Sequence, residues 1–241
     1  MRAVVFANGV LHRPDFLLRH LRADDWIVAA DGGARHCLAL GLTPSLLIGD
    51  FDSLPETARR RLEAAGTPSL KFPEAKDQTD LELALTHVIR QGADEILVAG
   101  ALGDRWDHSL ANVVLGLSPT LASASLTFDD GATAILFLHS GQTRSVRGRP
   151  GELVSLIPLH GDARGIVTHG LHYPLAGETL AFGSTRGVSN VLEDDQATVS
   201  LGSGSLIVVH TRPSPPARRP RRLSRRARAS STARRRPSGG S

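Results

Sequence analysis

Two aspartates separated by one residue stand directly after an apolar run. The run is Ser45-Leu46-Leu47-Ile48, and Gly49-Asp50-Phe51-Asp52-Ser53 follows it. A buried strand that ends in two acids delivers negative charge to an edge that a cation or a phosphate-bound metal can reach. The alternative is that Asp50 and Asp52 only cap the next turn, where aspartate is favoured. Further acidic turns at the same edge would favour the first interpretation.

Four turns of the first half carry at least one carboxylate. In an open α/β sheet, ligands bind outside the carboxyl ends of the strands, so the residues that follow each apolar run matter most. Acids gathered there repel one another unless a cation neutralises them, and Mg²⁺ prefers a few carboxylates together with phosphate oxygens or waters. We therefore predict a site for Mg²⁺ and a phosphate. The turns are Asp31-Gly32-Gly33, Gly49-Asp50-Phe51-Asp52-Ser53, Lys76-Asp77-Gln78-Thr79-Asp80 and Gly103-Asp104-Arg105-Trp106-Asp107-His108.

Glycines and basic residues in these turns agree with a phosphate ligand. Gly32 and Gly33 let the backbone approach a phosphate at a helix N-terminus, although the pair alone fits a tight strand-to-helix turn equally well. Arg105 is the predicted phosphate partner, since a guanidinium suits the charge spread over a phosphoryl group; the alternative is a surface ion pair with a neighbouring aspartate. Lys76 can reach a phosphate or can be a solvated loop charge. Trp106 is expected to pack in the core or the loop.

Several enzyme classes are excluded by pattern. The chain has no G-x-x-x-x-G-K-[ST], no G-x-G-x-x-G after a strand, no G-x-S-x-G and no H-E-x-x-H. These absences argue against a Walker-type ATPase, a nicotinamide dehydrogenase, a serine hydrolase and a zincin.

The elements that must position these turns alternate along residues 1–140. Continuous apolar runs predict strands with both faces covered, at 4–7, 26–30, 46–48, 96–99 and 135–138. Helical patterns lie between them at 15–21, 34–40, 56–65, 80–90 and 108–117, and Thr79-x-x-Glu82 is a capping box for the fourth. This βαβα order predicts an α/β domain with an open, mainly parallel sheet.

The pattern changes after residue 140. Short alternating runs at 153–157, 196–200 and 206–209 predict a small all-β sandwich domain over 141–210. Residues 211–241 are rich in Arg, Pro and Ser and are predicted to be a disordered tail whose deletion leaves catalysis intact. A nucleic-acid arm is the alternative for the tail, but the absence of aromatic residues weakens it.

Composition limits the cellular setting. The 241 residues are 41% hydrophobic, which suits one large or two modest domains. Cys37 is the only cysteine, and no apolar export segment or membrane span is apparent, so we expect a cytoplasmic protein that does not contact a membrane. The tail holds 11 of the 28 basic residues and none of the 24 acidic ones, which leaves residues 1–210 with a net charge of −7.

The four acidic blocks, in this order and spacing, resemble the signature blocks of the thiamine pyrophosphokinase family. Residues 168–175 and Gly187-Val188-Ser189-Asn190 are similar to the C-terminal β domain of that family. Two positions differ from the usual family pattern, because Asp104 replaces a small residue and Gln78 often has an acidic counterpart. The resemblance covers residues 1 to about 210.

The resemblance implies transfer of the terminal pyrophosphoryl group of ATP to the hydroxyethyl oxygen of thiamine, with release of AMP. It implies an Mg²⁺-dependent homodimer with active sites near the subunit interface. By motif position, Asp50, Asp52, Asp80 and Asp107 would bind metal and activate the hydroxyl, and Arg105 would hold phosphate. The nucleotide side would comprise Asp31, Gly32, Gly33, Asp77, Gln78, Thr79 and His108, and the residues facing thiamine would be Tyr173, Ser189 and Asn190.

Two other functions stay open at this point. The same acids can serve an Mg²⁺-dependent hydrolase that cleaves a nucleotide or a thiamine phosphate with water. The chain can also be a non-catalytic nucleotide-binding protein that acts through its arginine-rich tail.

Overall fold

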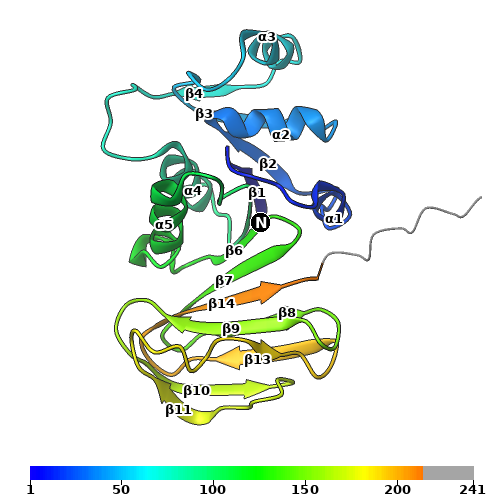
Figure 1. The fold of residues 1–241 in the computed structure, drawn as a ribbon. Coiled ribbons are helices and arrows are strands. Elements are labelled where there is room, and N and C mark those ends of the chain that lie inside the picture. Colours follow the sequence, from blue (N-terminus) through cyan, green and yellow to red (C-terminus); the bar gives the residue numbers. More distant parts are fainter. Residues whose placement is uncertain (214–241) are drawn as a thin grey trace, which may run out of the picture.

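The structure is a computed structural model that describes residues 1–213. A ten-stranded sheet runs through both halves of the chain, and a four-stranded antiparallel sheet packs on one end of it (Figure 1). The large sheet has the order β12-β9-β14-β7-β6-β5-β1-β2-β3-β4. Its parallel part comprises β1 (Arg2–Phe6), β2 (Trp26–Ala30), β3 (Leu46–Gly49), β4 (Ser69–Lys71), β5 (Glu95–Ala99) and β6 (Ser125–Asp129).

Four further strands extend this sheet in antiparallel fashion. They are β7 (Thr133–His139), β14 (Ser205–Thr211), β9 (Leu153–Pro158) and β12 (Asn190–Val191). The second sheet has the order β11-β10-β13-β8, from β8 (Thr143–Arg147), β10 (Ala163–His169), β11 (Ala176–Leu180) and β13 (Gln196–Ser200). The predicted sandwich is therefore present, and one of its layers is a continuation of the α/β sheet.

Helices cover both faces of the parallel part, as the continuous apolar runs predicted. Alternate residues of a strand point to opposite layers: Val5 packs toward α4, whereas Val4 and Phe6 pack toward the layer that contains α1, α2 and α3. The helices are α1 (Pro14–Leu18), α2 (Ala34–Ala39), α3 (Glu56–Ala64), α4 (Asp80–Arg90) and α5 (Trp106–Leu115), with short 3-10 turns η1 (Asp31–Gly33) and η2 (Pro119–Leu121).

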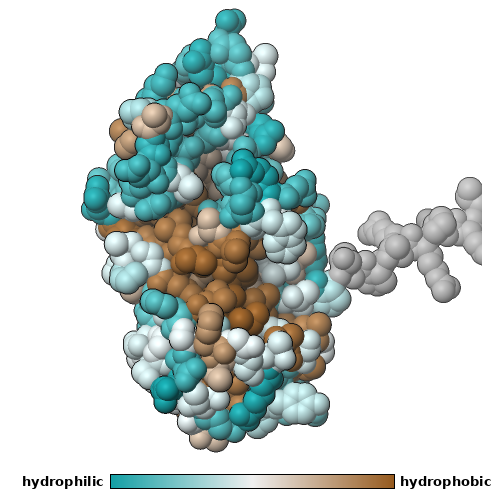
Figure 2. Space-filling view, turned by 60° about the vertical axis from the view of Figure 1, so that its left-hand side comes forward, coloured by the Kyte–Doolittle hydropathy of each residue, from teal (hydrophilic) through white to brown (hydrophobic). Residues whose placement is uncertain are grey.

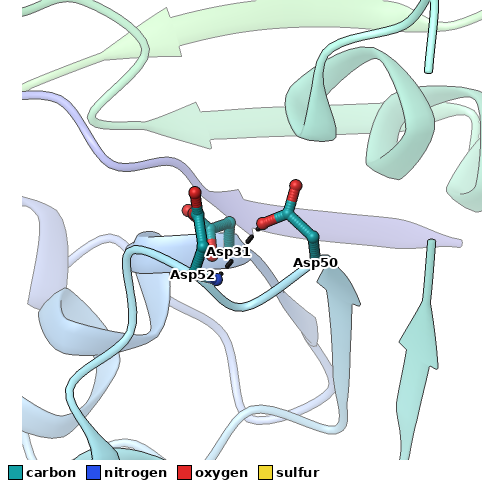
Figure 3. Close-up of side chains that lie close together, drawn as sticks. All are labelled: Asp31, Asp50 and Asp52. Atoms are coloured by element: carbon teal, nitrogen blue, oxygen red, sulfur yellow. Dashed lines mark hydrogen bonds between the residues drawn. The ribbon is translucent and has the colours of Figure 1, made fainter. Parts of the chain in front are cut away.

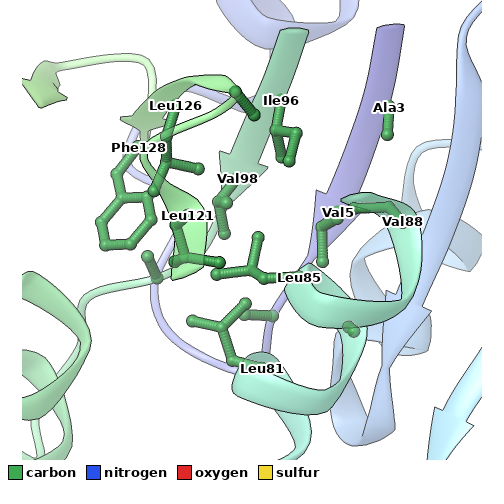
Figure 4. Packing of buried hydrophobic residues seen from close by; sticks show 14 of the residues in the cluster. Ala3, Val5, Leu81, Leu85, Val88, Ile96, Val98, Leu121, Leu126 and Phe128 are labelled. Carbon is green, nitrogen blue, oxygen red and sulfur yellow. The ribbon is translucent and has the colours of Figure 1, made fainter. Parts of the chain in front are cut away.

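Helix α4 shows how the sequence builds one of these layers. Thr79 accepts a hydrogen bond from the Glu82 backbone N–H at 3.2 Å, which caps the helix where the sequence predicted. Leu81, Leu85 and Val88 then follow at helical spacing and pack under the sheet (Figure 4). Full burial of each such side chain contributes about 2 kcal/mol to folding. The cap and this apolar stripe fix Asp80 as the first residue of α4.

The five predicted strands and five predicted helices of the first half are confirmed. The short β4, whose three residues are exposed, and the alternating β6 were not predicted, because neither contains a continuous apolar run. None of the helices within residues 1–213 is both long and apolar enough to cross a membrane.

The predicted tail begins too early. Strand β14 runs to Thr211, and the Arg212 backbone N–H donates a hydrogen bond to the carbonyl of Ala132 at 2.8 Å. The guanidinium of Arg212 also binds both carboxylate oxygens of Asp129 at 2.9 Å. The first two residues of the predicted tail thus belong to the fold, and residues 214–241 lie outside the described part of the chain.

Candidate active site

The carboxyl ends of β1, β2, β3 and β5 open into a cleft of about 680 Å³. The turns after these strands meet at one edge because the strands are parallel neighbours, as the sequence rule requires. A cleft of this size accommodates a ligand as large as a nucleotide. Its acidic and basic lining comprises Asp31, Asp50, Asp52, Glu74, Asp80 and Asp104 together with Arg35, Lys76, Arg105 and His108.

Three carboxylates meet on one side of the cleft. Asp31, Asp50 and Asp52 each offer one oxygen, and these oxygens all lie within 4.8 Å of one another (Figure 3). Asp31 is buried, Asp50 is half-buried and Asp52 is exposed, and the Asp52 backbone N–H donates to Asp50 Oδ1 at 3.2 Å. The predicted pair Asp50 and Asp52 is thus confirmed as neighbours. Asp31, which the resemblance placed on the nucleotide side, joins them.

The backbone around these acids is unusual. Asp31 and Phe51 have positive φ angles of 43° and 69°, which side-chain-bearing residues rarely adopt. Gly49 has φ 147°, and a Cβ there would lie 3.1 Å from the Asp31 Cβ and 3.2 Å from the Asp80 carboxyl carbon. Glycine at this position lets the strand end pass between the two acids.

Lys76 connects two of the predicted metal ligands. Its Nζ lies 2.9 Å from Asp50 Oδ2, with which it forms a hydrogen bond, and 2.9 Å from Asp80 Oδ1. The Asp80 contact lacks hydrogen-bond geometry, so Asp80 Oδ1 stays buried without a hydrogen bond, as does Asp31 Oδ1. These two buried oxygens belong to acids of the cleft and have no hydrogen bond within the described chain.

The electrostatics of this cluster differ from one carboxyl to the next. The hydrogen bond from Lys76 lowers the pKa of Asp50. Burial raises the pKa of Asp80, despite its contact with Lys76, and the charges of Asp50 and Asp31 add to this effect. Burial opposes the charge of Lys76, but its contacts with Asp50 and Asp80 outweigh burial, so the pKa of Lys76 is raised. Lys76 is therefore a firmly charged ammonium between two acids.

Arg105 and Asp107 form an exposed ion pair. Arg105 Nη2 donates to Asp107 Oδ2 at 2.5 Å, and this contact lowers the pKa of Asp107. The side chains are 70% and 63% exposed, and Asp107 does not line the cleft. The structure therefore does not bring Asp107 to the carboxylate cluster where the resemblance placed it, because α5 begins at Trp106 and turns Asp107 outward. Arg105 and His108 do line the cleft.

The other residues expected on the nucleotide side are divided. Gln78 and Thr79 line the cleft, whereas Asp77, Gly32 and Gly33 do not. A Cβ on Gly32 would lie 2.5 Å from the Asn8 side chain, and one on Gly33 would lie 2.0 Å from the Phe6 carbonyl oxygen. These glycines thus serve the tight strand-to-helix turn that was the alternative interpretation.

Several lining residues were missed in the sequence. Asn8 follows β1, and its side-chain oxygen accepts a hydrogen bond from Arg35 Nη2, while Arg35 Nε donates to the Gly32 carbonyl at 3.3 Å. Glu74 precedes Lys76 in the loop before α4. Ligands bind at the carboxyl ends of the strands, and this rule alone predicts a role for Asn8. The turn after β1 contains no carboxylate, so the search for acidic turns did not include it.

The residues expected to face thiamine form a separate group. The buried Asn190 side chain accepts from the Tyr173 N–H at 3.0 Å and donates to the Tyr173 carbonyl at 2.8 Å. This leaves the Tyr173 ring 65% exposed. Ser189 has φ 63°, and its N–H donates to Ser155 Oγ at 3.0 Å. None of Tyr173, Ser189 and Asn190 lines the acidic cleft.

Known proteins resemble this chain throughout its described part. The family model "Thiamin pyrophosphokinase, catalytic domain" matches residues 17–127, and "Thiamin pyrophosphokinase, vitamin B1 binding domain" matches residues 143–206. A thiamine pyrophosphokinase of Bacillus subtilis is 32% identical over 186 residues, which cover 77% of this chain and 86% of the relative.

Solved structures agree. The crystal structure of the Bacillus subtilis enzyme has a TM-score of 0.77 at 27% identity and covers 89% of this chain and 100% of its own. The Geobacillus thermodenitrificans thiamin pyrophosphokinase has a TM-score of 0.76 at 28% identity, covering 89% and 99%.

Proposed function

This chain belongs to the thiamine pyrophosphokinase family and catalyses the ATP-dependent pyrophosphorylation of thiamine; from that premise we propose that its acidic cleft binds ATP together with Mg²⁺. The observation that carries the proposal is the convergence of Asp31, Asp50 and Asp52 within 4.8 Å at the edge of the cleft. Asp80 adjoins them across Gly49. Asp107 instead orients Arg105.

The residues present fit a hard divalent cation. All four carboxylates offer oxygen, the ligand type that Mg²⁺ prefers. The buried oxygen Asp31 Oδ1 has no hydrogen-bond partner, Asp80 Oδ1 has only its ion-pair contact with Lys76, and a divalent cation would satisfy both. The bound ion would neutralise charge on the phosphates during transfer.

The remaining groups of the cleft suit the phosphates and the acceptor. Arg105 and Arg35 lie on the lining with exposed guanidinium groups, which can bind phosphate oxygens in pairs. Transfer requires the thiamine hydroxyl to lie in line with the β-phosphorus, and one carboxylate of the cluster accepts the hydroxyl proton. The partly solvated Asp50 and Asp52 are the candidates for that step.

Release of AMP distinguishes the candidate functions. Purified protein with ATP, Mg²⁺ and thiamine is expected to release AMP and form thiamine diphosphate in equal amounts, and release should stop when thiamine is omitted. AMP release that does not depend on thiamine would identify a hydrolase. ATP binding without any release would identify a non-catalytic nucleotide-binding protein.

We also propose that the enzyme acts as a homodimer joined through α5. Trp106, Leu110 and Val114 are 84%, 62% and 58% exposed, and their spacing of four residues places them on one face of the helix. The expectation that Trp106 packs in the core or loop is therefore wrong. Figure 2 turns the side of the molecule with α5 forward and shows a broad apolar surface in its middle. Such a surface is typical of an interface.

A second copy is the occupant that the site itself favours. The residues expected to face thiamine do not line the acidic cleft of their own chain, although the exposed Tyr173 and Val188 lie on the surface. Arg105, which lines the cleft, directly precedes α5. A partner seated on α5 would therefore lie beside the cleft, where it could supply the vitamin-binding side.

Leu110→Asp tests this interface. The variant should dissociate at concentrations where the unchanged protein is a dimer, with the dissociation constant raised about 30-fold or more, because a charge replaces a central apolar contact. Analytical ultracentrifugation measures the change. Leu18→Asp, on the exposed side of α1, is the matched control and should leave the dimer intact. A monomeric unchanged protein, or a Leu110→Asp dimer of normal affinity, would contradict the proposal.

A further inference from the structure

The ammonium of Lys76 occupies the space between two proposed metal ligands. Nζ lies 2.9 Å from both Asp50 Oδ2 and Asp80 Oδ1, and the Lys76 side chain is only 14% exposed. Asp50 follows β3, whereas Asp80 begins α4, so Lys76 connects the loop after one element to the start of another. The sequence left open whether Lys76 contacts phosphate or is a solvated charge, and its low exposure and two ion pairs show that it is not a solvated charge.

The choice of lysine here is informative. The chain has only two lysines, Lys71 and Lys76, among its 28 basic residues. An arginine would grip a carboxylate with a rigid, planar fork, whereas an ammonium is a compact point charge on a flexible stem. Lysine is therefore the side chain that most resembles a bound metal cation. Its flexible stem allows the ammonium to move away from the two carboxylates.

The charges around Lys76 require such a group. Asp31, Asp50, Asp52 and Asp80 lie together on one side of the cleft, and Asp31 and Asp80 each keep a buried oxygen without a hydrogen bond. Three of these carboxylates have oxygens within 4.8 Å of one another, and four acids gathered in this way repel one another when no cation is near. Lys76 supplies the one positive charge that touches two of them, and the part of the chain that the structure describes offers them no other ion-pair partner.

We propose that Lys76 is a built-in cation that holds Asp50 and Asp80 in place until Mg²⁺ and nucleotide enter, and that its ammonium then moves to the nucleotide phosphates. This rests on the proposed function of the acidic cleft. Lys76 and the metal compete for the same two carboxylates, so metal binds weakly to the empty cleft. A phosphate that attracts the ammonium removes the competition. Metal and nucleotide therefore strengthen each other's binding through Lys76.

Mn²⁺ binding to the full chain tests the proposal, measured by calorimetry with and without a non-hydrolysable ATP analogue. In the absence of nucleotide, Lys76→Met should bind Mn²⁺ about 5- to 100-fold more tightly than the unchanged protein, a range typical of coupling between sites. The analogue should strengthen Mn²⁺ binding strongly in the unchanged protein and much less in Lys76→Met. In EDTA, Lys76→Met should melt at a lower temperature and recover when Mn²⁺ is added.

Two controls separate this proposal from the function that it rests on. Lys71→Met removes the other, exposed lysine and should leave Mn²⁺ binding unchanged. Asp50→Asn should abolish the tight Mn²⁺ binding that the unchanged protein shows in the presence of the ATP analogue. If Asp50→Asn does so while Lys76→Met binds Mn²⁺ no more tightly than the unchanged protein, the metal site stands and the role of Lys76 is overturned. If Asp50→Asn leaves Mn²⁺ binding unchanged, the metal site and the role of Lys76 are both overturned.

Discussion

Asp50→Asn is expected to reduce the turnover of thiamine pyrophosphorylation about 1000-fold at saturating Mg²⁺, because charge stabilisation and positioning supply most of phosphoryl-transfer catalysis. The substitution keeps the size of the side chain and removes its charge. Asp50 is the residue that joins the carboxylate cluster to Lys76, so its charge acts on both. Neutralising it weakens the cluster without opening a cavity.

The measurement is steady-state AMP release with ATP and thiamine both varied. A loss in turnover that persists at saturating substrates places Asp50 in the transition state, whereas a rise in KM alone places it in substrate binding. Asp24→Asn, an exposed acid in the turn before β2, makes the same charge change away from the cleft and should retain full activity. Near-normal turnover of Asp50→Asn, in a protein with an unchanged melting temperature, would remove Asp50 from the mechanism.

Among the substitutions that we predict here, Arg212→Met should lower the stability of the folded protein most. Arg212 binds both oxygens of Asp129 at 2.9 Å, the two side chains are only 12% and 10% exposed, and the guanidinium lies 4.5 Å from the centre of the Phe16 ring. Its loss removes the ion-pair partner of the buried Asp129 carboxylate and leaves it the hydrogen bond from the Gly131 N–H, which costs about 3 kcal/mol. For a chain of this size, the melting temperature should fall by about 6 to 12 °C.

Two comparisons make this prediction specific. Arg164→Met removes a guanidinium whose ion pair with Asp162 is largely exposed, so it should change the melting temperature little. A chain that ends at Pro213 keeps Arg212 and should retain stability and turnover, whereas one that ends at His210 should lose stability as Arg212→Met does. Equal melting temperatures for the two truncated proteins would show that the ion pair between Arg212 and Asp129 contributes nothing to the stability of the fold.

Much of the fold could be predicted from the sequence, because a buried element requires apolar residues at consecutive or regularly spaced positions. A strand covered on both faces must be apolar at every position, and such runs marked β1, β2, β3, β5 and β7. Elements without such a run were missed. The three residues of β4 are exposed, so its place at the sheet edge depends mainly on pairing with β3.

The candidate site was predicted in part for the same reason. Asp31, Asp50 and Arg105 lie in the turns that follow the apolar runs of β2, β3 and β5, and parallel strands end at one edge. The sequence by itself therefore determined the acidic rim, and its four motif blocks determined the family.

Only the tertiary structure decided which side chains meet. Asp31 reaches the cluster from a turn in which its own φ angle is positive, while Asp107, in the first turn of α5, is exposed and stays outside it. Lys76 bridges Asp50 and Asp80 across 26 and four residues of sequence. The sheet likewise continues through β7, β14, β9 and β12, and no local pattern of residues specified the order in which these strands pair. Side-chain direction and long-range strand pairing depend on backbone geometry and sheet order, and a pattern of residue types along the chain records neither.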